Sequence, residues 1–236
     1  RQPDILAERV YAPWVDMERL LREKGVPLFS MESWTPLRDF EILGFTLQYE
    51  MSYTNILNML DLAGIPLHST RRGEGDPLVI AGGPCAFNPE PLAAFMDLFV
   101  IGDAEEAIHQ VLDTCKTWRG RGRQALLRAM ADIPGVYVPS LFEVEYDSRG
   151  RIQGWRPGGD GLTFPVQKRV APDLDLAPCP DTFPVPFMDI VHDRAMVEVL
   201  RGCTRGCRFC QAGMIYRPVR ERRPETVKRL VRTLLD

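Results

Sequence analysis

In the first 135 residues, short apolar runs typical of buried strands alternate with amphipathic segments typical of helices. The strand-like runs lie at 9–14, 41–47, 77–81 and 98–101, and the helical patterns at 16–24, 52–63, 104–118 and 125–133. Strands separated by helices pair in parallel, with helices on both faces of the sheet. We therefore expect a doubly wound, Rossmann-like α/β domain over residues 1–135.

Polar residues and glycines follow the strand-like runs. Ligands of doubly wound sheets bind at the carboxyl ends of the strands, where this sequence places Thr46, Gln48, Gly82, Gly83, Pro84, Gly102 and Glu105. Glycines at such ends allow close approach of a bulky ligand, although Gly-Gly-Pro is also consistent with a tight turn. The sequence has no G-x-G-x-x-G or G-x4-G-K-[ST] motif, which argues against nucleotide binding by those routes.

Residues 136–193 differ in character. Segments 142–146 and 151–155 alternate apolar and polar residues around a turn at 147–150, which predicts a β-hairpin. Glycines at 158–161 and a proline-rich run at 177–186 follow. We interpret 136–193 as a connector between two domains.

Three cysteines, Cys203, Cys207 and Cys210, have the spacing C-x3-C-x2-C. Thiolates are the usual ligands of iron–sulfur clusters, and three of them can hold three corners of a cubane cluster and leave one iron open. A zinc site is an alternative, although zinc knuckles come as paired C-x2-C units and only Cys207 and Cys210 form one. Redox or structural thiols are the remaining alternative.

Residues 201–213 resemble the signature C-x3-C-x-aromatic-C of the radical S-adenosylmethionine (radical SAM) enzymes, with Phe209 at the aromatic position. The resemblance implies that the three cysteines bind a [4Fe-4S] cluster whose fourth iron is chelated by S-adenosylmethionine. Reductive cleavage would then give a 5′-deoxyadenosyl radical. It also implies that Phe209 contacts the adenine, that Arg201 and Arg205 tune the anionic site, and that an electron donor such as flavodoxin or ferredoxin is a partner.

The apolar run 195–200 predicts a buried strand before the cysteines, and the apolar stripe at 224–235 predicts a helix after them. We expect residues 194–236 to be the first strand–helix unit of a radical SAM (β/α) barrel, with the cysteines at the carboxyl end of its strand. Because a barrel takes roughly 200 residues, we expect a truncated barrel and a fragment cut at both ends, itself inactive.

Upstream of such a signature, residues 1–135 resemble the cobalamin-binding domain of many radical SAM enzymes, through runs 78–84, 88–90 and 97–105. On that resemblance, the strand-end residues would line cobalamin: Thr46, Gln48, Gly82, Gly83, Pro84, Gly102 and Glu105. The Asp-x-His-x-x-Gly segment that supplies a cobalt-binding histidine elsewhere is absent. A domain that has lost cobalamin is therefore an alternative.

Charge is unevenly distributed. From Arg194 onward eleven lysines and arginines accompany four acidic residues, although the whole chain has a net charge of −3. Arginines surround the cysteines at positions 201, 205, 208, 217, 220, 222 and 223. They suit an anionic cluster, a nucleic acid or simply a solvated face. With no membrane-length apolar run, signal peptide or disulfide framework in the sequence, the cytoplasm is the simplest compartment.

Three functions follow. The first is a radical SAM enzyme that performs methylation or rearrangement, with cobalamin as methyl carrier. The second is a cobalamin-free enzyme that modifies RNA or protein, similar to the methylthiotransferases. The third is a non-enzymatic binding module with a structural metal. The substrate, a small molecule or a macromolecule, stays open at this point.

Overall fold

The computed structural model describes residues 4–179, 191, 194 and 196–235. The chain divides into two compact units, residues 1–169 and 170–236, so the boundary falls inside the predicted connector. The proline-rich end of that connector at 180–190, and residue 195 of the predicted barrel strand, lie outside the described residues. No helix among the described residues combines the length and apolarity needed to cross a membrane.

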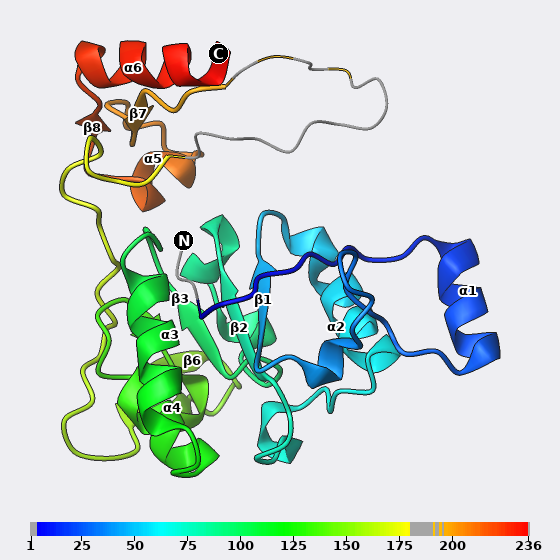
Figure 1. Ribbon diagram of the computed structural model, residues 1–236. Coiled ribbons are helices and arrows are strands. Elements are labelled where there is room, and N and C mark those ends of the chain that lie inside the picture. The colour runs from blue at the N-terminus through cyan, green and yellow to red at the C-terminus, as the bar shows by residue number, and fades with distance from the viewer. Residues whose placement is uncertain (1–3, 180–190, 192–193, 195, 236) are drawn as a thin grey trace. The chain divides into compact units, whose positions relative to one another are not determined.

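The first unit is built on a sheet of four strands (Figure 1). Strands β1 (Ile42–Thr46), β2 (Leu78–Gly82) and β3 (Leu98–Val100) are parallel neighbours in that order. The two-residue strand β4 (Val136–Tyr137) pairs antiparallel with β3. The expected α/β fold with a parallel-rich sheet is confirmed, and β4 was missed because two residues carry no period-2 pattern.

Helices cover both faces of this sheet. Side chains of β2 and β3 alternate between two apolar clusters: Val79 and Phe99 face one, Ile80 and Leu98 the other. The first cluster includes residues of the helices α1 (Val15–Lys24) and α2 (Tyr53–Leu62). The second includes residues of α3 (Ala107–Trp118) and α4 (Arg123–Met130). The crossover from β2 to β3 uses the short 3-10 turns Pro84–Phe87 and Glu90–Leu92.

The strand expected at 9–14 is wrong, because these residues form no strand. Arg9 is held by isolated contacts instead: its carbonyl accepts from the Met31 amide at 2.8 Å, and its guanidinium pairs with Glu32. Pro13 in this run has no N–H to donate to a sheet ladder.

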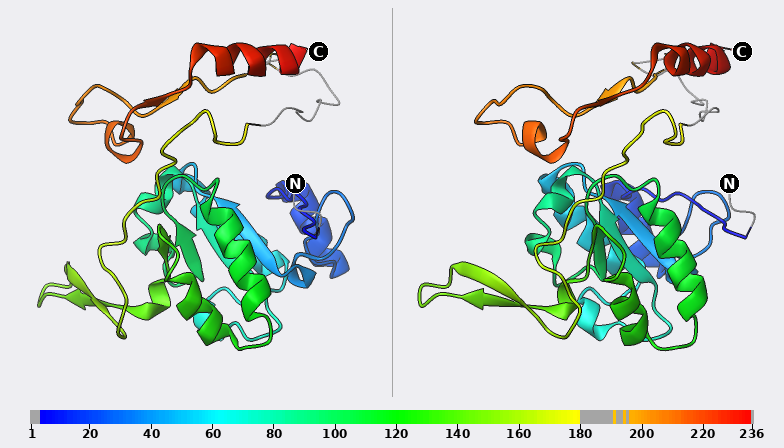
Figure 2. Two further views of the ribbon diagram at one scale, coloured as in Figure 1. Left: turned by 60° about the vertical axis from the view of Figure 1, so that its left-hand side comes forward. Right: turned by 90° about the vertical axis from the view of Figure 1, so that its left-hand side faces the viewer.

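The predicted hairpin is confirmed as β5 (Phe142–Tyr146) paired antiparallel with β6 (Ile152–Pro157). Figure 2 shows this yellow-green hairpin extending away from the four-stranded sheet. Its base is fixed to the sheet through Glu90, whose Oε1 accepts from the Tyr137 hydroxyl at 2.8 Å and from Trp155 Nε1 at 3.1 Å. The hairpin therefore belongs to the first unit.

A buried ionic cluster closes the amino end of β3. Asp97 Oδ2 accepts from Arg72 Nη1 at 3.0 Å, from Arg123 Nη2 at 2.8 Å and from the Val79 amide at 2.7 Å. The two guanidinium groups also donate to backbone carbonyls, including Phe95 O and Pro77 O. Burial lowers the pKa of Arg72, and the Asp97 carboxylate opposes that shift. This carboxylate therefore joins three segments of the first unit.

The second unit contains β7 (Leu200–Arg201), β8 (Arg220–Glu221), α5 (Ala212–Ile215) and α6 (Pro224–Leu235). The helix expected at 224–235 is confirmed. The buried strand expected at 195–200 is wrong in extent, because only its last residue is in β7, and Met196, Val199 and Leu200 are 67%, 49% and 46% exposed. Within the described residues β7 pairs antiparallel with β8. The barrel itself stays a prediction.

Candidate functional site

The cysteines lie in one loop, residues 201–213, which we call the cysteine loop. It leaves β7 at Gly202, whose φ is 98°. A Cβ at this position would lie 2.8 Å from both Pro218 O and Val219 Cα. Only glycine allows this combination of backbone angle and close approach, so the loop begins in tight contact with the segment that leads into β8.

All three cysteines of the loop are free thiols. Cys203 and Cys210 are half-buried and Cys207 is exposed. The Arg205 amide donates to Cys203 Sγ at 3.4 Å, and the Cys210 amide donates to Cys207 O at 3.1 Å. The Cys203 sulfur and the Cys207 carbonyl are thus both hydrogen-bonded to the backbone of the loop.

In the part of the chain that the structure describes, no three cysteine, histidine or acidic side chains are gathered as a ready metal site. The fold thus brings the thiols into one short loop without bringing their sulfurs together. Their chemistry nevertheless fits an iron–sulfur cluster, because soft thiolates are the ligands such clusters prefer.

Several arginines near the cysteine loop have partners within the second unit. Arg201 forms a two-pronged ion pair with Glu198, at 2.7 and 3.0 Å, which lowers the pKa of that carboxyl. Arg222 and Arg223 bind residues between 174 and 177. Arg205 and Arg208 are exposed. The basic run is therefore in large part structural, and the exposed Arg205 and Arg208 are the residues of this run that can meet an anionic ligand.

Phe209, the residue expected to meet the adenine, is 92% exposed. Its ring packs little against the chain, so its contact with a ligand stays a prediction.

The strand-end residues of the first unit do meet at one edge of the sheet. Thr46 is in register with Gly82, and Gly82 with Val100. Thr46 and Gln48 are exposed, and Gln48 Nε2 donates to Thr46 Oγ1 at 2.7 Å. Thr46 and Gly82 therefore lie at the carboxyl ends of neighbouring parallel strands, as the strand pattern predicts.

The space beside Gly83 is filled by the chain itself. A Cβ on Gly83 would lie 2.9 Å from Leu47 O. That carbonyl accepts from the Cys85 amide at 3.0 Å, and the Leu47 amide donates to Gly82 O at 2.6 Å. The Gly-Gly-Pro segment thus serves as the tight turn that was one of its two interpretations.

Gly102 is closed off in the same way, by the connector. Its φ is 101°, and a Cβ there would collide with Arg169 O. The Arg169 amide donates to Ile101 O at 2.8 Å, and the Arg169 carbonyl accepts from the Asp103 amide at 2.9 Å. These two bonds form an isolated parallel β-bridge between Gly102 and Arg169. Its guanidinium pairs with Glu106 at 2.6 Å.

These two contacts bear on the cobalamin resemblance. A cofactor lying against the strand-end backbone would need the space that Leu47 and Arg169 occupy. The residues present therefore do not fit a cobalamin-binding site at Gly83 and Gly102. Contacts within the chain explain why glycine occurs at these two positions.

The contact at Gly102 leads to a testable prediction. Gly102→Ala should destabilise the first unit by about 1–3 kcal/mol through backbone strain, and it should release the connector at Arg169. Urea unfolding measures the first effect and limited proteolysis near residue 169 the second. Gly75→Ala is the matched control, because nothing lies within 4 Å of its Cβ position and its φ is not positive. Equal stability of the two variants would contradict this account.

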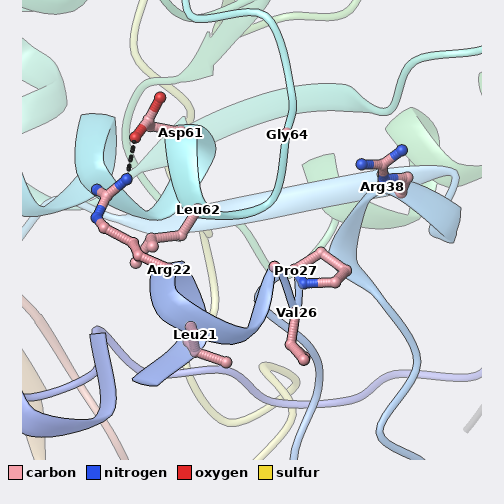
Figure 3. Close-up of a pocket in the computed structure, with 9 residues that line it drawn as sticks. Leu21, Arg22, Val26, Pro27, Arg38, Asp61, Leu62 and Gly64 are labelled. Atoms are coloured by element: carbon pink, nitrogen blue, oxygen red, sulfur yellow. Dashed lines mark hydrogen bonds and ion pairs between the residues drawn. The ribbon is translucent and has the colours of Figure 1, made fainter. Parts of the chain in front are cut away.

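A shallow pocket of about 210 Å³ lies elsewhere, at the carboxyl ends of α1 and α2 (Figure 3). Its polar lining is Arg22, Asp61 and Arg38, of which Arg22 and Asp61 form an ion pair at 2.8 Å. Cationic side chains are expected beside helix carboxyl ends. The pocket contains none of the predicted site residues.

Outside the cysteine loop, the sequence favours small buried hydrophobes for Cys85, Cys115 and Cys179; the structure confirms this for Cys85, whereas Cys115 and Cys179 are half-buried. Cys85 is buried, which raises its pKa, and burial raises the pKa of Cys115 to about 11.

Sequence reasoning missed two residues that the geometry makes prominent, Arg169 and Arg222. Only the glycine at 102 gave a signal for the first, as a place of close approach. The second was one arginine among many.

Comparison with known proteins agrees with the motif. Residues 1–139 match the family described as radical SAM proteins, N-terminal. The chain is also 26% identical over 211 residues to an uncharacterised protein of Methanocaldococcus jannaschii, an alignment that covers 86% of this chain and 37% of that relative. The chain thus spans under two fifths of the length of the curated relative it matches. Because the family match covers more than half of the sequence, this chain belongs to the radical SAM proteins, whose N-terminal region it contains.

Proposed function

We propose that the chain is part of a radical SAM enzyme in which Cys203, Cys207 and Cys210 hold a [4Fe-4S] cluster. The observation that carries the proposal is the occurrence of three free thiols in one short loop of a chain that belongs to this family. When bound, the cluster and S-adenosylmethionine would supply a 5′-deoxyadenosyl radical for hydrogen abstraction from a substrate.

The chain's own residues would position this chemistry. Gly202 anchors the start of the loop, and the Arg205 amide bonds to the Cys203 sulfur. Arg201 is held by Glu198, so its charge acts from a fixed place beside the loop. The exposed ring of Phe209 is available to stack on the adenine. A one-electron donor such as flavodoxin or ferredoxin would supply the electron, in the cytoplasm.

Of the two enzymatic alternatives, the backbone contacts that fill the space beside Gly83 and Gly102 favour the cobalamin-free one. The first unit would then serve recognition or support, and the substrate would be an RNA or protein group, as for the methylthiotransferases. We predict that hydroxocobalamin titrated into the full-length protein gives no bound-cobalamin absorbance after gel filtration. Uptake of one equivalent would return the methyl-carrier function to consideration.

The test of the main proposal is anaerobic reconstitution of the full-length protein. We expect about four irons and four sulfides per chain, and 5′-deoxyadenosine on reduction with S-adenosylmethionine. One zinc per chain without iron would contradict the proposal and favour the non-enzymatic metal module.

A further inference from the structure

A buried arginine connects the cysteine loop to a segment nearly fifty residues upstream. Arg222 lies one residue beyond β8, and its side chain is 2% exposed. An arginine so deeply buried needs acceptors for its donors. The second unit supplies these from two places, residues 174–177 and residue 198.

One side of the guanidinium binds the segment 171–177, which we call the brace. Arg222 Nη1 donates to Leu174 O and, at 3.4 Å, to Ala177 O. Two neighbouring arginines bind the same segment: Arg220 Nη1 donates to Ala171 O at 2.9 Å, and Arg223 Nε pairs with Asp175 at 2.5 Å. The brace is therefore held at several points by the residues that follow the cysteine loop.

The other side of the guanidinium binds the backbone that runs into the cysteine loop. Arg222 Nε donates to Glu198 O at 3.1 Å, and Nη2 lies 3.3 Å from Glu198 Oε2. The Arg222 amide also donates to Val199 O at 2.9 Å. Glu198 in turn holds Arg201, the first residue of the loop.

We propose that Arg222 is a positioning residue for the cysteine loop, because its planar fork fastens the backbone at 198–199 to the carbonyls of the brace. The proposal rests on the proposed function, since it takes this loop as the cluster site. A guanidinium with these bonds and this burial has no surface to offer a phosphate, which sets Arg222 apart from the exposed Arg205 and Arg208.

The substitution Arg222→Lys tests the proposal in the full-length protein. A lysine keeps the charge, but one ammonium cannot reach acceptors on both the brace and Glu198. In the metal-free variant we expect amides at 198–203 to exchange with deuterium about tenfold faster, while α6 keeps its protection. On reconstitution we expect about 10–100-fold weaker apparent binding of iron, the usual effect of losing a group that orients metal ligands.

Arg229→Lys is the matched control, because Arg229 is an exposed arginine of α6 that lies outside both the brace and the cysteine loop. It should leave both exchange at 198–203 and iron binding unchanged. Circular dichroism checks that each variant is folded. If Arg222→Lys does not fold, Glu198→Gln replaces it. The glutamine removes the carboxylate charge that binds Arg222 and Arg201 but keeps an acceptor oxygen, so the variant should fold and still show faster exchange at 198–203.

The outcomes separate the two proposals. Wild-type exchange and iron binding in Arg222→Lys would overturn the positioning role, and so would faster exchange spread evenly over residues 196–235, which indicates general stabilisation only. If the wild-type protein binds no cluster, the proposed function fails. Exchange in the metal-free protein still decides whether Arg222 holds the loop.

Discussion

Alanine at any one of Cys203, Cys207 or Cys210 will reduce 5′-deoxyadenosine formation to the background rate. Three thiolates are the minimum that can hold a cubane cluster with one open iron, and the described residues offer no fourth ligand gathered beside them that could take over. Iron and sulfide content should fall together with the nucleoside. The measurement is anaerobic reconstitution of each full-length variant, followed by reduction in the presence of S-adenosylmethionine.

Cys115→Ala is the control for this series. Cys115 lies in α3, and burial raises its pKa to about 11, so it stays a thiol at neutral pH and is a poor metal ligand. Its variant should keep full iron content and nucleoside formation. A loop variant that retains wild-type nucleoside formation would remove the assigned cysteine from the cluster site.

The fold of the first unit was predictable where an apolar run forms a strand that is buried between helices. The runs that became β2 and β3 are apolar and buried on both faces, as strands covered by helices on both sides must be. The errors lie where a local pattern has no such support. The apolar run 9–14 contains a proline and has no sheet partner, and β4 is too short to show a period.

The site was predictable to the level of residue type and spacing. Cysteine spacing depends on local chain geometry, so it can be read from the sequence alone. The contacts of Arg169 with Gly102 and of Arg222 with the brace join residues more than forty positions apart. No periodic pattern encodes such contacts. The glycine at position 102 indicated that another group lies close to the backbone there. The sequence could not decide whether that group belongs to a ligand or to the chain itself.

Asp97→Ala should destabilise the first unit by about 3–5 kcal/mol, the usual cost of removing one partner from a buried ion pair. The carboxylate is 1% exposed and is the shared acceptor of Arg72, 0% exposed, and Arg123, 11% exposed. Without it, two buried guanidinium groups lose their counter-charge, and the Val79 amide loses its acceptor. Because whole domains are stable by only about 5–15 kcal/mol, we expect this substitution to remove a large share of the stability of the first unit.

Urea unfolding followed by circular dichroism measures this effect, and two further variants identify its cause. Asp97→Asn keeps the shape and can still accept a hydrogen bond, so an intermediate loss indicates that charge and hydrogen bonding both contribute. Asp132→Ala removes an exposed partner of Arg128 and should change stability by no more than about 1 kcal/mol. If Asp97→Ala were as stable as Asp132→Ala, the buried cluster would not be what joins the amino end of β3 to the two arginine segments. The stability of the first unit would then come from its two apolar clusters alone.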